Sequence, residues 1–148
     1  MQHINRWMIV ILLILAAFQL GACSQTPPVT ASKIQPAQVE KIEGTELNRV
    51  VLTEKAAQRL DIQTAPVREE QMNGTQRLVV PYAAVIYDVH GETWTYTSPA
   101  PLTFVREPIT VDYIEGDMAV LVDGPATGTE VVMVGAAELY GADTGIGK

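Results

Sequence analysis

The strongest constraint on the fold is a short unit that recurs between residues 78 and 141. Each copy has a glycine, a polar step and then an apolar strand, and the copies begin at Gly91, Gly116 and Gly128. Aromatic and β-branched runs bounded by Gly, Asp and Pro are typical of strands joined by turns. Because one such unit cannot bury a face alone, the stretch has to fold back on itself or close. We therefore predict a mainly β fold, a small antiparallel β-barrel or meander with one short helix.

The first turn of this meander is expected to bring aromatic side chains into the core. Residues 83–87 are expected to form one strand, and residues 93–97 form the strand that returns the chain. In the returning strand, Trp94 and Tyr96 alternate with threonines, which predicts that the two rings share one face. Large aromatic side chains dominate burial in small β domains, so we expect that face to be core. The pattern assigns no face to two further aromatic residues, Tyr82 and Tyr87.

The segment before the meander carries a helix signal and a hairpin signal. Residues 49–53 predict a strand, and the side chain of Thr53 can cap a short helix over residues 54–60. Residues 62–67 predict a second strand, which its proline places at an edge or a bend. The pair Asn73-Gly74 then lies between extended segments. Both residues accept positive φ, so this pair predicts a tight hairpin.

The bulk composition argues against a nucleic-acid surface. The chain has 148 residues, enough for one domain with short appendages, and 47% of them are hydrophobic. Its formal charge is -7 and its Lys and Arg residues are scattered, whereas a phosphate backbone requires a positive stripe. The single cysteine excludes an internal disulfide.

Residues 1–22 read as a signal peptide. A short segment with one arginine precedes the apolar run of residues 7–18. As a helix this run covers about 18 Å, against roughly 30 Å of bilayer hydrocarbon, so it suits a signal peptide better than a membrane span.

The tetrapeptide Leu20-Gly21-Ala22-Cys23 closes this segment and resembles the bacterial lipobox. The resemblance implies that Cys23 is the mature N-terminus and carries a thioether-linked lipid and usually an N-acyl chain, palmitate among them. An uncleaved anchor and an ordinary secretory signal followed by a stray thiol are the alternatives. More than one acyl chain anchors a protein stably, so we expect a periplasmic lipoprotein held in a bacterial membrane. Ser24 resembles the outer-membrane sorting choice, but that rule varies between lineages, and inner or outer membrane stays open.

Composition divides the mature chain into three parts. Residues 23–44 carry three prolines among small and polar residues and are expected to form a flexible tether. Residues 45–141 are expected to form the β domain, and residues 142–148 a frayed, Gly-rich tail. A tether of about twenty residues has a root-mean-square reach near 25 Å, which keeps the domain close to its membrane.

Several runs of the domain carry a resemblance to one known family: Leu52-Thr53-Glu54-Lys55-Ala56-Ala57, Leu60-Asp61-Ile62-Gln63-Thr64-Ala65-Pro66-Val67, Val79-Val80-Pro81-Tyr82-Ala83-Ala84, Gly91-Glu92-Thr93-Trp94-Thr95-Tyr96, Phe104-Val105-Arg106-Glu107-Pro108 and Gly128-Thr129-Glu130-Val131-Val132. They resemble periplasmic adaptor subunits, or membrane fusion proteins, of resistance-nodulation-division efflux pumps. The first two runs resemble the opening of the mature adaptor, and the others resemble its C-terminal membrane-proximal domain. Over residues 48–141 the resemblance implies that fold and docking onto the periplasmic face of the inner-membrane transporter.

The chain departs from that family between the two halves of the resemblance. In the family, a biotinyl-lipoyl-like sandwich, an α-helical hairpin and a β-barrel lie there, whereas about ten residues centred on Asn73-Gly74 join the halves here. The resemblance implies that chain from both ends completes the membrane-proximal domain. A tight hairpin at this point would therefore leave the domain able to fold alone. Without the intervening domains, we do not expect the protein to bridge the periplasm.

Candidate docking residues are acids in and beside turns. The resemblance transfers no docking motif, so the candidates are chosen by character around the Gly116 and Gly124 turns: Asp112, Glu115, Asp117 and Asp123. Ordinary solvated turn residues are the simpler interpretation of such acids.

Metal binding and catalysis are not predicted. His90 lies in a turn beside Asp88, but a metal site needs three or four ligands, and turn polarity explains both residues. The sequence has no Ser/His/Asp order, Cys/His pair or phosphate-cradling glycine loop, so we expect no cofactor and no enzymatic activity.

Two functional hypotheses of different classes follow. The first is a lipid-anchored periplasmic accessory or modulator protein of an efflux pump. It would dock by protein–protein contacts to the inner-membrane efflux transporter or to its full-length periplasmic adaptor. The alternative is a small periplasmic metal or ligand carrier that reuses the fold. A decayed remnant without a present role is a third hypothesis, which the intact signal and strand pattern disfavour.

Overall fold

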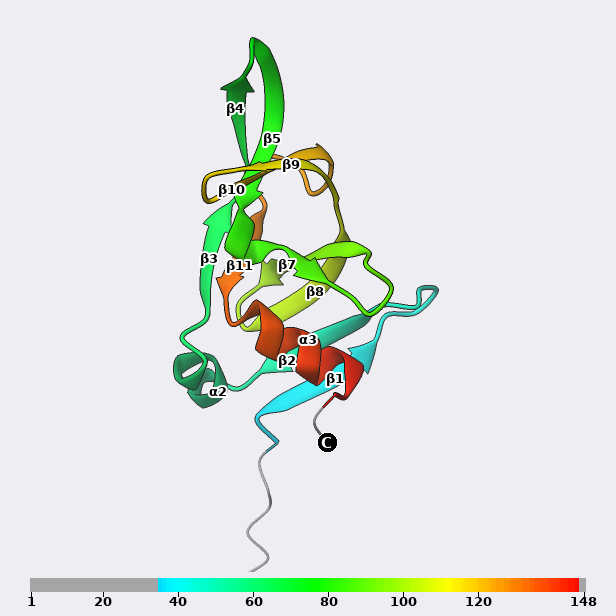
Figure 1. Ribbon diagram of the computed structural model, residues 1–148. Helices are drawn as coiled ribbons and strands as arrows, with labels where there is room; N and C mark the ends of the chain where they lie inside the picture. Colours follow the sequence, from blue (N-terminus) through cyan, green and yellow to red (C-terminus); the bar gives the residue numbers. More distant parts are fainter. Residues whose placement is uncertain (1–34, 147–148) are drawn as a thin grey trace, which may run out of the picture. The chain divides into compact units, whose positions relative to one another are not determined.

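The computed structural model describes residues 35–146, and in them two antiparallel sheets are accompanied by two α-helices (Figure 1). The signal peptide, Cys23 with its lipobox and most of the expected tether lie outside the described residues. The mainly β prediction is confirmed, but neither sheet closes on itself, so the fold is not a barrel. In the described part of the chain, every helix is too short or too polar to span a membrane.

The first sheet, sheet A, is built from both halves of the chain. Its order is β1 (Ala37–Lys41), β2 (Asn48–Leu52), β8 (Thr103–Pro108), β7 (Thr93–Ala100), β11 (Glu130–Val134) and β3 (Gln63–Pro66), and β6 (Ile86–Tyr87) also pairs with β7. Strands from the N-terminal half therefore occupy both edges, and strands from the C-terminal half fill the middle.

The second sheet, sheet B, consists of two adjacent hairpins. Its order is β4 (Arg68–Met72), β5 (Thr75–Pro81), β10 (Met118–Asp123) and β9 (Thr110–Glu115). Within the described domain, the tip of the β4–β5 hairpin lies at the opposite end from the helices (Figure 1).

The Asn73-Gly74 hairpin forms as predicted. Met72 pairs with Thr75, so the turn has two residues, and their φ angles are +51° and +80°. Positive φ at both positions matches the right-handed twist of the flanking strands, which makes this turn type the favoured one.

One helix was expected in the domain, and residues 35–146 contain two. Helix α2 (Glu54–Arg59) begins as predicted, because the Thr53 hydroxyl accepts a hydrogen bond from the N–H of Ala56 at 3.2 Å. Helix α3 (Ala136–Thr144) was not predicted, and its last residues belong to the expected tail. The tail prediction is therefore wrong for residues 142–144. Leu139 and Asp143 are buried against sheet A, and this packing holds the helix in place.

Two further expectations require correction. Residues 37–41 belong to the expected tether, yet they form β1, which pairs along its whole length with β2. The edge strand β1 is held by backbone hydrogen bonds to β2, and its side chains are mostly exposed. Its few apolar residues therefore did not predict a strand. Residues 83–87 do not form one strand, because η2 (Tyr82–Ala84) is a 3₁₀ turn and β6 has only two residues.

Sheet A is covered on both faces at β11. Val132 belongs to a core cluster with Leu139 of α3, whereas its neighbour Val131 belongs to a second cluster with Leu121 of β10. Successive strand residues point to opposite faces, so β11 joins the helix layer on one side to sheet B on the other. The threonine side of β7 is covered as well, since Thr95 is fully buried. The expected burial of the aromatic side is confirmed for Tyr96, while Trp94 is only half-buried.

Candidate docking surface

The β9–β10 turn exposes two of the predicted acids. Met118 pairs with Glu115, so Gly116 and Asp117 form a two-residue turn at the end of the hairpin. Glu115 and Asp117 are both exposed there. Neither takes part in an ion pair among the described residues, and their negative charge is therefore available to a partner.

One tyrosine lies beside this acidic turn, and a second tyrosine lies beside the first. The N–H of Tyr82 donates to the carbonyl oxygen of Asp117 at 2.7 Å, which joins η2 to the turn. Tyr82 and Tyr87 are 44% and 51% exposed, so large parts of both rings face solvent. Desolvation, the proximity of Tyr82 and a hydrogen bond between the two side chains raise the pKa of Tyr87. Tyr82, Tyr87, Glu115 and Asp117 define the aromatic–acidic surface.

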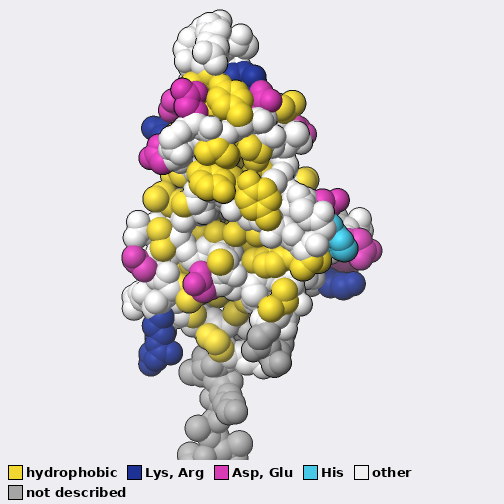
Figure 2. Space-filling model, in the orientation of Figure 1, with side chains coloured by type: hydrophobic (Ala, Val, Ile, Leu, Met, Phe, Trp, Pro, Cys, Tyr) yellow, Lys and Arg dark blue, Asp and Glu magenta, His cyan; other side chains and the backbone are white. Residues whose placement is uncertain are grey.

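Apolar side chains are prominent on the surface of the domain. Figure 2 shows a band of them across the middle of the face in view, with acidic side chains around it. Exposed aromatic residues beside charged ones are characteristic of protein–protein interfaces, where aromatic rings anchor the contact and charges select the partner.

A third predicted acid, Asp112, is paired within the domain. Its Oδ2 lies 2.6 Å from Nη2 of Arg77, a residue of β5. Nη2 of Arg77 also donates to the carbonyl oxygen of Leu121 at 3.3 Å. Such a partly exposed pair is worth about 0–1 kcal/mol, but it reduces the negative charge that Asp112 offers to a partner.

The fourth predicted acid, Asp123, lies at the other end of β10. About 17 Å of strand separates it from Met118, so it does not form one cluster with the acids of the turn. Asp123 lies near Glu107, because desolvation and the charge of Asp123 raise the pKa of Glu107. The four predicted acids thus lie along one hairpin, but only Glu115 and Asp117 share a site.

In the turn that contains His90, the carboxylate of Asp88 is hydrogen-bonded to groups of the turn and of the strand that follows it. Oδ1 of Asp88 accepts hydrogen bonds from the N–H of His90 at 2.8 Å and of Glu92 at 2.9 Å, and Oδ2 accepts from Nε1 of Trp94 at 3.2 Å. Desolvation acts to raise the pKa of Asp88, but these hydrogen bonds outweigh it and hold the pKa below its ordinary value. No group of three His, Cys, Asp or Glu residues in the described chain is arranged to hold a metal.

A buried polar network, which the sequence did not predict, attaches α3 to sheet A. The carboxylate of Asp143 accepts hydrogen bonds from Nδ2 of Asn48 and from the hydroxyl of Tyr96, both at 2.8 Å. Nε of Arg106 lies 3.5 Å from the same carboxylate, and its guanidinium stacks 4.4 Å from the ring centre of Trp94. Asp143 is only 2% exposed at its side chain, so these donors compensate a buried charge. We interpret the network as structural.

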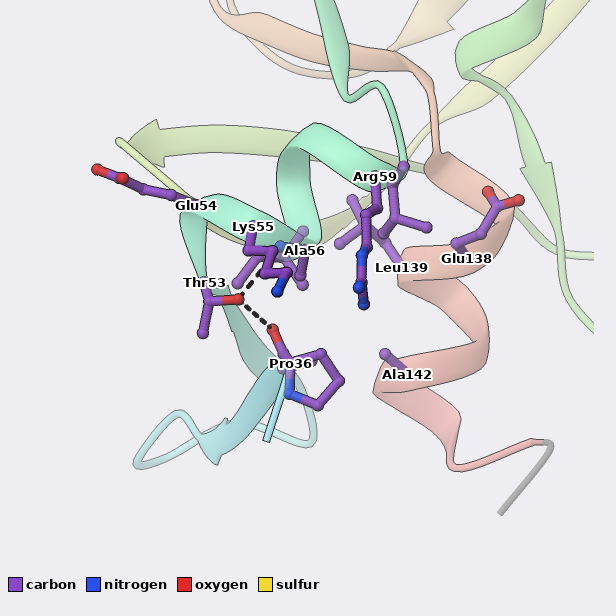
Figure 3. A pocket seen from close by; sticks show the side chains of 12 residues that line it. Pro36, Thr53, Glu54, Lys55, Ala56, Arg59, Glu138, Leu139 and Ala142 are labelled. Carbon is purple, nitrogen blue, oxygen red and sulfur yellow. Dashed lines mark hydrogen bonds between the residues drawn. The ribbon is translucent and has the colours of Figure 1, made fainter. Parts of the chain in front are cut away.

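A groove lies between α2 and α3 (Figure 3). It measures about 760 Å³ and is lined mainly by apolar groups from α2, α3, β2 and the start of β1, including Leu52, Leu60, Leu139 and Ala142. This volume falls within the range of about 300–1,000 Å³ that is typical of small-molecule sites. The sequence did not predict the groove, because its walls come from segments far apart in the chain.

The chain matches no family model, no curated protein and no solved structure in the comparisons with known proteins. The resemblance to efflux-pump adaptors therefore rests on short sequence runs between Leu52 and Val132.

Proposed function

We propose that this protein is a lipid-anchored periplasmic accessory or modulator protein of an efflux pump. It acts by docking to the inner-membrane transporter or to the full-length adaptor of the pump. The observation that carries this proposal is the composition of sheet A, in which β1, β2 and β3 precede the Asn73-Gly74 hairpin and β7, β8 and β11 follow it.

This strand order is what a membrane-proximal domain completed from both ends of a chain requires. The strands before and after the hairpin are paired with each other, as in Val50 with Phe104 and Val132 with Thr64. The two-residue turn closes the gap between the halves at little entropic cost. A docking module that has no bridging domains is the basis of the accessory role.

The aromatic–acidic surface is the proposed contact with the pump. Tyrosine supplies a large, rigid contact area, and a few such residues carry most of the binding energy in protein interfaces. Glu115 and Asp117 supply charge that steers association toward a basic partner surface. The proposed partner therefore presents a basic patch beside apolar pockets.

The decisive experiment is cross-linking in native membranes of the producing bacterium. The full chain with a C-terminal tag is cross-linked gently and purified, and its partners are identified by mass spectrometry. Three versions are compared: wild type, E115K/D117K and the charge-matched control E43K/E46K. Glu43 and Glu46 are exposed residues of the β1–β2 connection, outside the aromatic–acidic surface.

The expected result is capture of an efflux transporter or a full-length adaptor by wild type and by the control, with strongly reduced capture by E115K/D117K. Equal capture by all three would exclude the acidic turn as the contact. If wild type captures neither component while remaining acylated and folded, the accessory role is wrong.

The ligand-carrier alternative has one observation in its favour, the groove between α2 and α3. It predicts a small molecule in stoichiometric amount after gentle purification. Native mass spectrometry of the freshly purified protein distinguishes the two hypotheses: a stoichiometric metal ion or soluble small molecule supports the carrier, whereas a bound membrane phospholipid is compatible with the accessory role.

A further inference from the structure

We propose that the groove between α2 and α3 binds an acyl chain of an anionic phospholipid in the membrane that holds the anchor. This inference rests on the proposed lipid anchor and adds a second, non-covalent contact with the bilayer. It also gives the domain a defined orientation, with the groove facing the membrane.

The floor of the groove suits a hydrocarbon chain. Half-buried Leu60 and Ala142 present apolar surface to the groove, and the buried side chains of Leu52 and Leu139 lie behind it. Pro36 and Ala37 close the groove on the side of β1. Transfer of methylene groups from water onto such a surface is favourable in proportion to the apolar area covered.

The charges of the rim select an anionic headgroup. Figure 3 shows the side chains of Lys55 and Arg59 directed into the space between the helices, whereas those of Glu54 and Glu138 point away from it. Lys55 and Arg59 are four residues apart on α2, and neither makes an ion pair within residues 35–146. Two unpaired cations beside an apolar groove match a lipid with an anionic headgroup and a hydrocarbon chain. Anionic membrane surfaces also attract basic side chains that lie close to them.

The chain length outside the described residues places the groove within reach of the bilayer. Pro36 lines the groove, and twelve residues separate it from Cys23. A segment of this length has a root-mean-square span of about 20 Å. An acylated Cys23 in the membrane therefore keeps the groove within the distance at which a lipid chain can enter it.

The test uses the acylated full chain in vesicles of phosphatidylglycerol that carries a photoreactive diazirine at the end of one acyl chain. After irradiation, lipid adducts are mapped by peptide mass spectrometry. Adducts are expected on peptides that contain Leu52, Leu60 or Leu139. The same probe on phosphatidylcholine is expected to label these peptides several-fold less.

Two pairs of variants isolate the groove. A142W fills it, and A137W places the same side chain on an exposed position of the same helix. K55E/R59E reverses the charge of the rim, and K41E/R68E makes the same charge change at exposed positions elsewhere. We expect several-fold less labelling in A142W and loss of the preference for phosphatidylglycerol in K55E/R59E. Both controls are expected to behave as wild type, and circular dichroism verifies that each variant is folded.

The intact mass of the protein separates this inference from the proposed function. If the wild-type chain is acylated but its groove peptides stay unlabelled, the lipid-binding inference is wrong, whereas the proposed lipid anchor at Cys23 is supported. Labelled groove peptides in a chain that is not acylated at Cys23 would support the lipid site and remove the anchor. Equal labelling of A142W and A137W would also overturn the inference.

Discussion

The backbone N–H of Tyr82 donates to the carbonyl oxygen of Asp117 at 2.7 Å, and this contact places a half-exposed aromatic ring beside an acidic turn. Tyr82 lies in η2, directly after β5, and Asp117 lies in the β9–β10 turn, so the surface they form depends on the pairing of β5 with β10. The contribution of this surface to partner binding can be measured by replacing its residues.

Replacing both tyrosines of this surface should weaken docking. Y82A/Y87A removes two aromatic anchors and should reduce capture of the efflux transporter or adaptor by about tenfold or more, as expected for interface hot spots. Quantitative cross-linking in native membranes measures the loss. V122A/I146A, which truncates two other exposed apolar residues, should capture the partner as wild type does. Equal losses in the two double variants would argue against a local contact.

Tyr96 should make the stability of the domain fall at high pH. Burial, reinforced by the hydrogen bond to Asp143 and the charge of that carboxylate, raises the pKa of Tyr96 above its ordinary value. As the pH rises, the unfolded chain therefore loses this proton first, near pH 10. The contribution of Tyr96 is fully present below about pH 10 and is lost above it, at about 1.4 kcal/mol per pH unit.

Urea unfolding between about pH 9 and about pH 11 measures this effect. Y96F should abolish the part of the slope that belongs to Tyr96. It should also cost about 1–3 kcal/mol at neutral pH, because Asp143 loses a donor. Y113F, a tyrosine change outside the network, should retain the slope. An unchanged slope in Y96F would show that Tyr96 ionises alike in the folded and unfolded chain.

Gly135 should tolerate alanine less well than Gly128 does. Both have positive φ, +86° and +87°, so alanine at either position carries the left-handed cost of about 1–2 kcal/mol. At Gly135 a Cβ would also overlap Cδ1 of Ile62, whereas nothing lies within 4 Å at Gly128. Overpacking of this kind adds about 1–3 kcal/mol.

Thermal or urea unfolding of G135A and G128A tests this difference. I62V/G135A should recover much of the extra loss, because valine has no Cδ1. If G135A and G128A are equally stable, Ile62 moves aside without cost.

The Asn73-Gly74 turn should accept an insertion. Eight Gly and Ser residues between Asn73 and Gly74 should cost about 1.5 kcal/mol, the entropy of closing a longer loop. The same insertion between Gly116 and Asp117 should cost little more but should impair capture of the partner, since it disrupts the turn that Tyr82 contacts. Urea unfolding and cross-linking measure the two effects separately. Global unfolding after the first insertion would contradict the self-contained domain on which the proposed function rests.

Local signals in the sequence predicted local structure well. The Thr53 cap, the Asn73-Gly74 turn and the strands after Gly91, Gly116 and Gly128 are present as expected. In each of these cases the deciding interaction joins residues that are near in sequence, and residue type alone indicates it.

Features that depend on distant residues were not predictable in this way. Strand β1 exists because β2 pairs with it, and α3 contains Gly141 and Thr144, which are weak helix formers. The network around Asp143 joins residues up to 95 positions apart. Of the four predicted acids, only Glu115 and Asp117 form a shared surface, and the tyrosines that complete it had no assigned face.

The interleaving of strands in sheet A has a consequence for how the chain folds. Because β3 pairs with β11, the N-terminal half holds an unpaired strand until the last strand of the sheet has been synthesised. Pairing between strands so far apart in sequence slows folding, and neither half of the chain can complete sheet A without the other. For a chain exported as we propose, this order keeps the protein in an open, translocation-competent form until its final strand is available.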